Sequence, residues 1–236
     1  MQSTITLVTP DNYKVYGTLD QISTTDKLII IVHGLSGSSE EHIFVNGAKF
    51  FNQQWYDVCR IDFYCEKEWS RKLWETNVSE HSDDLLLLIN HFQGTYKKIF
   101  LIGHSLWWLT IMWKPISSIQ WAVLRDPSLY PSSEGEYVLK PNKQKYLLNR
   151  GENLYISDHM VKERTEDKTE LLAKYTIPTK IIFASKESLK DQRTAIKSDL
   201  QFPCEFTTID WASHCFDEEG TEEKLFEETL VWLNKK

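Results

Sequence analysis

Apolar, β-branched runs alternate along the chain with segments whose apolar residues recur at helical spacing. Residues 28–32, 98–102 and 179–184 are the clearest runs, because apolar side chains dominate each of them without alternation. A strand buried on both faces of a parallel sheet has this composition, whereas a strand with one wet face alternates. Strands that alternate with helical segments predict a parallel sheet with crossover helices, which is the α/β class.

The remaining segments extend this pattern to nearly the full length of the chain. Residues 4–8 and 13–19 predict an antiparallel pair around the turn Pro10-Asp11-Asn12. Further strands are expected at 57–63, 119–124 and 204–209, and helices at 45–54, 79–92, 106–113 and 222–233. We therefore predict one domain, 1–236, with about eight strands in a mostly parallel sheet flanked by helices.

The alternation is lost between the strand at 119–124 and the strand at 179–184, where Pro, Ser, Tyr and charged residues replace it. A long irregular stretch between two sheet strands usually carries function, often as a cover over a site. We predict that residues 127–177 form a short lid or cap insertion.

Composition narrows the possible partners. The 236 residues carry a formal net charge of −7, which argues against nucleic acid and against anionic lipid, since both require a basic surface. No apolar run approaches the roughly 20 residues of a membrane helix, and the N-terminus lacks a secretory signal. The four cysteines lack the close pairs of a zinc site. They predict reduced thiols in a cytoplasmic protein without a metal.

One segment carries an identifiable chemistry. Gly103-His104-Ser105 lies between a buried strand and a short apolar helix. In this context a sharp turn lifts the serine hydroxyl above the sheet edge, beside backbone N–H groups that can stabilise an oxyanion. We therefore expect Ser105 to be a nucleophile.

With this segment the chain resembles the α/β-hydrolase family, most of all small bacterial esterases and acylglycerol-lipase-like hydrolases. The resemblance covers nearly the whole chain and implies the α/β-hydrolase fold without a cofactor. His33-Gly34-Leu35-Ser36-Gly37 is similar to the family's loop after a central strand. The similarity implies that the backbone N–H groups of Leu35 and Leu106 form the oxyanion hole.

The resemblance also implies a base and an acid. Asp210-Trp211-Ala212-Ser213-His214 looks like the family's loop after the last strand, which makes His214 the general base. Glu187 follows the strand at 179–184, where relatives usually carry Asp, and is the expected acid. Asp126 and Asp191 are open alternatives.

These parts together define a mechanism. The imidazole takes the serine proton and the carboxylate stabilises the charged imidazole. Ser105 then attacks a small-molecule ester or thioester, and water clears the acyl-enzyme. A monomer or a homodimer is compatible with this reading.

Tryptophan stands at several positions where the family carries glycine. Relatives read Gly-Gly where this chain has Trp107 and Trp108, and Trp55 and Trp211 also take usual glycine positions. A glycine-rich loop of the family is replaced by residues 65–69. The chain has 9 Gly and 9 Trp, whereas average usage would give roughly 16 glycines.

Tryptophan at 107 and 108 is expected to overpack the elbow, the turn at Ser105 with the helix that follows it. Tryptophan at positions with left-handed backbone is expected to strain that backbone. Redesign, a gene whose UGA codons specify glycine, and drift are three possible origins. The alternative function is a catalytically weak or redesigned hydrolase-fold binding protein whose pocket is filled by tryptophan.

Overall fold

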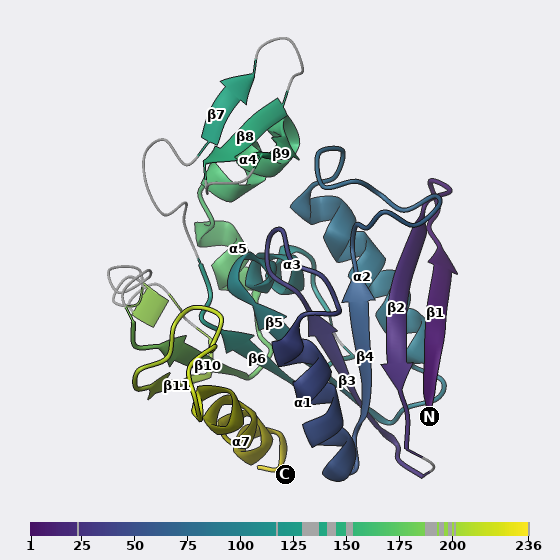
Figure 1. Cartoon of the computed structure of the whole chain (residues 1–236), viewed down its shortest axis with the longest axis vertical. Helices are drawn as coiled ribbons and strands as arrows, with labels where there is room; N and C mark the ends of the chain where they lie inside the picture. The colour runs from purple at the N-terminus through teal and green to yellow at the C-terminus, as the bar shows by residue number, and fades with distance from the viewer. Residues whose placement is uncertain are drawn as a thin grey trace.

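A single eight-stranded sheet runs through the molecule in the order β1-β2-β4-β3-β5-β6-β10-β11 (Figure 1). The computed structural model describes residues 1–22, 24–116, 118–128, 137–140, 145–149, 153–186, 193, 196–197, 200 and 202–235. The strands of the sheet are β1 (Gln2–Val8), β2 (Lys14–Asp20), β3 (Lys27–Val32), β4 (Asp57–Asp62), β5 (Lys98–His104), β6 (Trp121–Arg125), β10 (Thr179–Ala184) and β11 (Cys204–Ile209). The β1–β2 and β2–β4 pairs are antiparallel and the other neighbours are parallel, which confirms the predicted sheet.

Helices cover both faces of the sheet. Helices α1 (His42–Gln53) and α7 (Thr221–Leu233) lie on one face, and α2 (Val78–Phe92) and α3 (Trp108–Trp113) lie on the other (Figure 1). The burial of β3 on both faces explains why its sequence shows no alternation of apolar and polar residues. Ile29 and Ile31 belong to one buried cluster, while Leu28, Ile30 and Val32 belong to the other. Since both faces are covered, every position from Leu28 to Val32 is apolar.

The insertion between β6 and β10 contains its own small sheet. Its described elements are β7 (Tyr137–Lys140), β8 (Lys145–Asn149), β9 (Asn153–Ser157), α4 (Asp158–Thr165) and α5 (Thr169–Lys174). The three strands pair antiparallel, and Figure 1 shows them beyond one end of the main sheet. The sequence pattern did not predict these strands.

Helix α4 is tied to the start of α2. The Glu163 carboxylate accepts hydrogen bonds from the backbone N–H groups of Val78 and Ser79, at 2.6 and 3.3 Å. The Ser157 hydroxyl donates to the Thr76 carbonyl at 2.7 Å. A carboxylate at a helix N-terminus is favoured because unpaired N–H groups point outward there. The insertion is therefore fixed to the main body at the end of the molecule where strands β3, β5 and β6 terminate.

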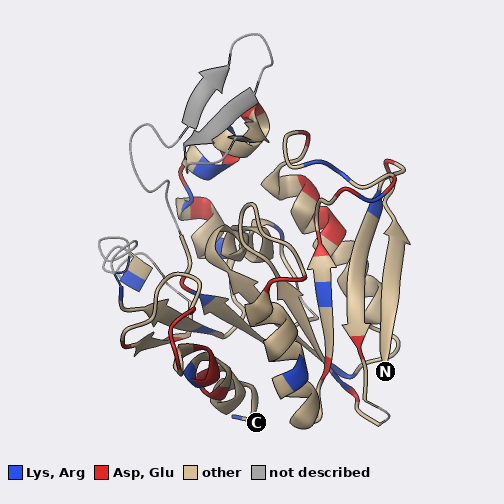
Figure 2. Ribbon diagram, viewed as in Figure 1, with Lys and Arg blue, Asp and Glu red and all other residues tan. Residues whose placement is uncertain are grey.

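Helices α2 and α7 both contain acidic residues, shown in red in Figure 2, and lie on opposite sides of the sheet. Within the described residues, no helix combines the length and the apolar character that a membrane span requires.

Candidate active site

Ser105 lies in a strained turn between β5 and α3. Its φ is +56°, a left-handed conformation that is unfavourable for a residue with a side chain by about 1–2 kcal/mol. Strain of this kind persists only where the surroundings fix it. Here a Cβ on Gly34 would lie 3.3 Å from the Ser105 Cβ, and one on Gly103 would lie 2.7 Å from Ile111 Cδ1. The two glycines therefore allow the β3 loop and α3 to pack tightly around the serine.

Three side chains from distant parts of the chain form a hydrogen-bonded relay. His214 Nε2 is 2.8 Å from Ser105 Oγ, and His214 Nδ1 is 2.6 Å from Asp126 Oδ2. The carboxylate can only accept, so Nδ1 carries the proton and Nε2 accepts from the serine hydroxyl. The Asp126 side chain is 1% exposed and the His214 side chain 28% exposed. The acid is thus buried, while the imidazole can be reached from outside.

The carboxylate in this relay is Asp126, one of the open alternatives. Glu187, the expected acid, and Asp191 lie outside the described residues. Strand register explains why Asp126 reaches the site: Arg125 on β6 pairs with His104 on β5, so the residues that follow, Asp126 and Ser105, are neighbours across the sheet edge.

Asp126 is held from the β10 side by two bonds. Its backbone N–H donates to the Ile182 carbonyl at 2.7 Å, and its Oδ1 accepts from the Ala184 N–H at 3.0 Å. The Asp126 φ is +39°, which is strained for a non-glycine residue. These bonds orient the second carboxylate oxygen toward His214.

The residues of the expected oxyanion hole border the same turn. Leu106 directly follows Ser105, and Leu35 follows Gly34, the residue packed against the Ser105 Cβ. Both leucines are buried. Their backbone N–H groups are the candidates for stabilising an oxyanion formed at Ser105.

Two buried histidines, His33 and His104, directly precede Gly34 and Ser105. Burial lowers the pKa of His104 to about 3, and its Nε2 lies 2.9 Å from the His214 carbonyl, to which it must donate. Burial also lowers the pKa of His33, whose Nδ1 is 2.8 Å from the Gly34 carbonyl. Both imidazoles hold loop backbone in place. Each supports a loop that carries a candidate site residue.

The two tryptophans of the elbow are accommodated in the core. Trp107 and Trp108 have φ values of −75° and −54°, so neither needs the left-handed conformation. The Trp107 ring contacts Phe63 and His81, with ring centroids 5.4 and 4.4 Å away. The expected overpacking does not push the helix off the sheet, since a Cβ on Gly103 would still lie 3.5 Å from the Trp107 carbonyl.

Trp108 makes a contact that the sequence pattern did not predict. Its indole N–H donates to the Ser128 carbonyl at 2.8 Å, and the Ser128 N–H donates to the Ser105 carbonyl at 3.2 Å. Ser128 lies two residues after Asp126. The indole therefore connects the nucleophile turn to the loop that carries the acid.

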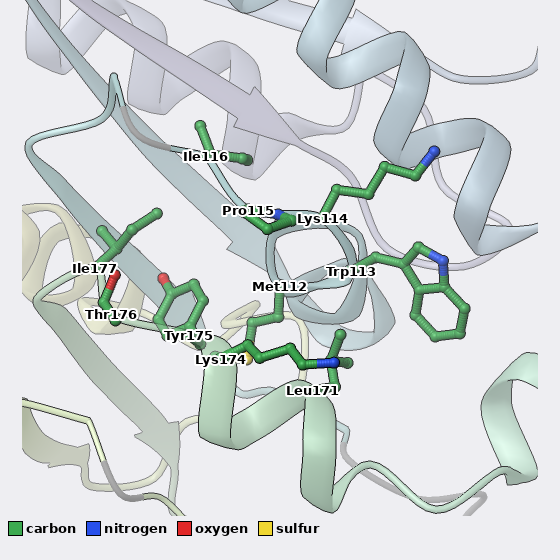
Figure 3. A pocket seen from close by; sticks show the side chains of 10 residues that line it. All are labelled: Met112, Trp113, Lys114, Pro115, Ile116, Leu171, Lys174, Tyr175, Thr176 and Ile177. Atoms are coloured by element: carbon green, nitrogen blue, oxygen red, sulfur yellow. The ribbon is translucent and has the colours of Figure 1, made fainter.

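Two cavities lie near the insertion. A cavity of about 140 Å³ is lined by residues of α3 and α5, and Figure 3 shows its lining side chains coming from both helices and the segments that follow them. A second cavity, of about 220 Å³, is lined by Ser36, by residues between Tyr64 and Trp74, and by Leu154 and Tyr155 of β9. In the part of the chain that the structure describes, no group of three or more His, Cys, Asp or Glu side chains is placed to hold a metal ion.

Comparison with known proteins identifies the fold. No protein-family model and no curated protein sequence matches the chain. Among solved structures, it is similar to Est1E from Butyrivibrio proteoclasticus with bound ferulic acid, at 20% identity, 97% coverage of both chains and a TM-score of 0.79. The α/β hydrolase GrgF from Penicillium sp. sh18 matches at 13% identity, covering 100% of this chain and 98% of that one, with a TM-score of 0.80.

The esterase Pf2001 of Pyrococcus furiosus is similar at 18% identity, covering 100% of this chain and 92% of its own, with a TM-score of 0.72. The chain has a mostly parallel sheet with a serine turn after β5, and it shares its architecture with these proteins. These features together assign it to one fold class. The chain has the α/β-hydrolase fold, as its sequence predicted.

Proposed function

We propose that the chain is a serine hydrolase that cleaves carboxylic esters or thioesters through an acyl-enzyme on Ser105. One observation supports this above all others: the relay from Ser105 Oγ through His214 to Asp126, with contacts of 2.8 and 2.6 Å. A serine hydroxyl becomes a useful nucleophile only when a base is within hydrogen-bond reach, and the base needs an orienting partner. Both conditions are met here.

The proposed reaction proceeds in two halves. Ser105 Oγ attacks the carbonyl carbon while its proton passes to His214 Nε2, and Asp126 stabilises the resulting imidazolium. The oxyanion accepts hydrogen bonds from the backbone N–H groups of Leu35 and Leu106. The carbon–oxygen or carbon–sulfur bond then breaks, and His214 returns the proton to the leaving alcohol or thiol. Water repeats the sequence on the acyl-enzyme and releases the acid.

The names of the structural neighbours agree with ester chemistry. Est1E was solved with ferulic acid, a small aromatic carboxylic acid, and Pf2001 is an esterase. Small-molecule esters are therefore the proposed substrates, and the insertion of residues 127–177 is the proposed lid over them. The steps above require no metal and no organic cofactor.

Replacement of the nucleophile tests this function. Ser105→Ala should abolish labelling by a fluorophosphonate probe and hydrolysis of p-nitrophenyl esters, with little change in thermal unfolding. Turnover by this variant near the starting level would contradict the assignment. A folded wild-type chain that neither labels nor turns over esters would favour the alternative, a hydrolase-fold binding protein.

A pair of amide substitutions tests the acid. We propose that Asp126, rather than Glu187, orients His214. Asp126→Asn should lower kcat by up to about 10⁴-fold, the loss seen when a triad carboxylate becomes an amide. Glu187→Gln should change kcat less than about threefold, because on this proposal its carboxylate has no role in the relay. The reverse pattern would assign the acid to Glu187.

A further inference from the structure

The loop between β11 and α7 carries His214 and is strained on both sides of it (Figure 1). Trp211 and Phe216 have φ values of +66° and +58°, in the left-handed region that residues with side chains rarely adopt. Strained backbone of this kind persists only where surrounding contacts fix it. The position of the His214 imidazole therefore depends on the groups that hold this loop.

One of these groups is the carboxylate of Glu218. Its Oε2 accepts a hydrogen bond at 2.7 Å from the backbone N–H of Ser213, the residue directly before His214. Its other oxygen, Oε1, accepts from the Lys186 ammonium at 2.6 Å. The bond from Lys186, together with the one from Ser213, lowers the pKa of Glu218 to about 2, so the carboxylate is ionised at neutral pH. Both bonds are therefore charge-assisted, which makes them stronger than bonds between neutral groups.

The backbone of Glu218 is fixed by the start of α7. The Thr221 hydroxyl donates to the carbonyls of Phe216 and Glu218, at 2.9 and 2.7 Å. The Thr221 N–H also donates to the Glu218 carbonyl, at 3.0 Å. The Glu218 side chain thus extends from a fixed backbone to the Ser213 N–H on the other side of His214.

The segment after β10 holds the same loop from a second direction. Lys186 lies two residues after the end of β10, and its backbone N–H donates to the Ala212 carbonyl at 2.8 Å. The Ser185 hydroxyl accepts from the Trp211 N–H at 2.6 Å. The ion pair between Lys186 and Glu218 therefore adds a side-chain connection to two bonds that involve the loop backbone.

This segment also contacts the acid. Ala184, the last residue of β10, donates its N–H to Asp126 Oδ1 at 3.0 Å, and Asp126 Oδ2 lies 2.6 Å from His214 Nδ1. Residues 184–186 thus bond the acid with one backbone group and the loop of the base with others. Because the bonds of Asp126 do not involve Glu218, loss of the Glu218 carboxylate moves the base relative to an acid that stays in place.

We propose that Glu218 is a positioning residue for His214, and that Lys186 orients the Glu218 carboxylate. This inference rests on the proposed ester hydrolysis, because it assigns the group that aligns the base of that reaction. Glu218 acts through the Ser213 backbone and not on the reacting atoms. A displacement of about 1 Å at a catalytic group can lower the rate on the order of 100-fold, so a bond to the adjacent backbone is sufficient to affect catalysis.

Substitutions at Glu218 test the role, with p-nitrophenyl acetate as substrate. Glu218→Ala removes the acceptor of the Ser213 N–H and should lower kcat about 10–100-fold, with KM changed less than about twofold, because a misplaced base affects the chemical step. Glu218→Gln retains an oxygen that can accept from Ser213, so its kcat should lie within about threefold of wild type. Glu219→Ala, at the exposed neighbouring position, is the matched control and should leave both constants unchanged.

A double-mutant comparison tests the part played by Lys186. Lys186→Met removes the ion pair but leaves the Ser213 bond, so it should lower kcat less than Glu218→Ala does. Combined with Glu218→Ala, it should give the same kcat as Glu218→Ala alone, because Lys186 acts through the carboxylate. Losses that multiply in the combined variant would mean that Lys186 acts independently of Glu218, and would overturn its assigned role.

Fluorophosphonate labelling separates this inference from the proposed function. A wild-type chain that neither labels nor hydrolyses esters contradicts the proposed function itself. An active wild type whose Glu218→Ala variant labels and turns over at the wild-type rate would overturn the positioning role, even if that variant melts at a lower temperature. Equal loss of kcat in Glu218→Gln and Glu218→Ala would overturn it as well. If Glu218→Ala does not fold, Glu218→Asp takes its place, since it keeps the charge but is one carbon too short to reach Ser213.

Discussion

Five tryptophans in glycine-like positions divide into two groups. Trp55, Trp69 and Trp211 are 64%, 62% and 77% exposed, and their φ values are +64°, +62° and +66°. Trp107 and Trp108 are 0% and 1% exposed, with helical φ values of −75° and −54°. The same substitution pattern in the sequence thus strains the backbone in the first group and fills space in the second.

Trp55 shows the first situation most clearly. It follows the end of α1, where the Tyr56 N–H bonds the Phe51 carbonyl at 3.1 Å and the Trp55 N–H bonds the Asn52 carbonyl at 3.2 Å. These two bonds define a Schellman motif, whose left-handed residue is usually glycine. An exposed indole gains little from burial there, so the conformational strain has no local compensation.

Trp107 and Trp108 both lie in the core, but they differ in the hydrogen bonding of their indole N–H groups. Trp107 packs among aromatic rings, but its indole N–H has no acceptor among the described residues. The Trp108 indole N–H bonds the Ser128 carbonyl. The effect of a side chain at a glycine-like position therefore depends both on the backbone angle there and on the space around it.

The largest expected effect comes from removing the buried rings. Trp107→Gly or Trp108→Gly should each lower the free energy of unfolding by at least about 3–5 kcal/mol, as for truncation of a core tryptophan. Urea unfolding measures this loss. A gain in stability would contradict the packing described above. All five tryptophans would then behave as glycine positions, as expected if the gene encodes glycine there.

Phenylalanine distinguishes the two buried indoles. Trp108→Phe removes the bond to Ser128 and should lower the free energy of unfolding by about 1 kcal/mol more than Trp107→Phe, which removes an unpaired N–H. Because Ser128 lies beside Asp126, Trp108→Phe should also lower kcat more than Trp107→Phe, with a smaller change in KM. Equal kcat values in the two variants would mean that the Ser128 bond does not position the acid.

Glycine in place of an exposed tryptophan should raise the free energy of unfolding, and the change should be smaller than at the buried pair. Relief of the left-handed strain gains about 1–2 kcal/mol. The flexibility of glycine offsets about 0.5–1 kcal/mol of that gain. Trp55→Gly, Trp69→Gly and Trp211→Gly should therefore each raise the free energy of unfolding by roughly 0.5–1 kcal/mol.

A neighbouring position supplies the control for the exposed group. Gln54 is exposed, adjoins Trp55 and has a φ of −101°, which most residues adopt. Gln54→Gly should therefore lower stability, since it adds flexibility without relieving strain. If glycine changes the free energy of unfolding equally at 54 and 55, the left-handed backbone at Trp55 is not the cause of that change.

Local sequence patterns predicted the strands of the main sheet and the turn that carries Ser105. The unbroken apolar runs require strands buried on both faces, and Gly103 ahead of the serine permits close helix packing. Such signals are readable because they depend on neighbours in the chain.

The carboxylate that meets His214 and the set of strained tryptophans follow instead from long-range contacts in the folded chain. The position of Asp126 depends on the register between β5 and β6, two strands joined by a helix, and not on any local motif. Trp55 and Trp107 both stand at glycine-like positions, yet one meets solvent and the other meets Phe63 and His81. Contacts between residues far apart in the chain arise only when the sheet assembles, so no reading of neighbouring residues could supply them.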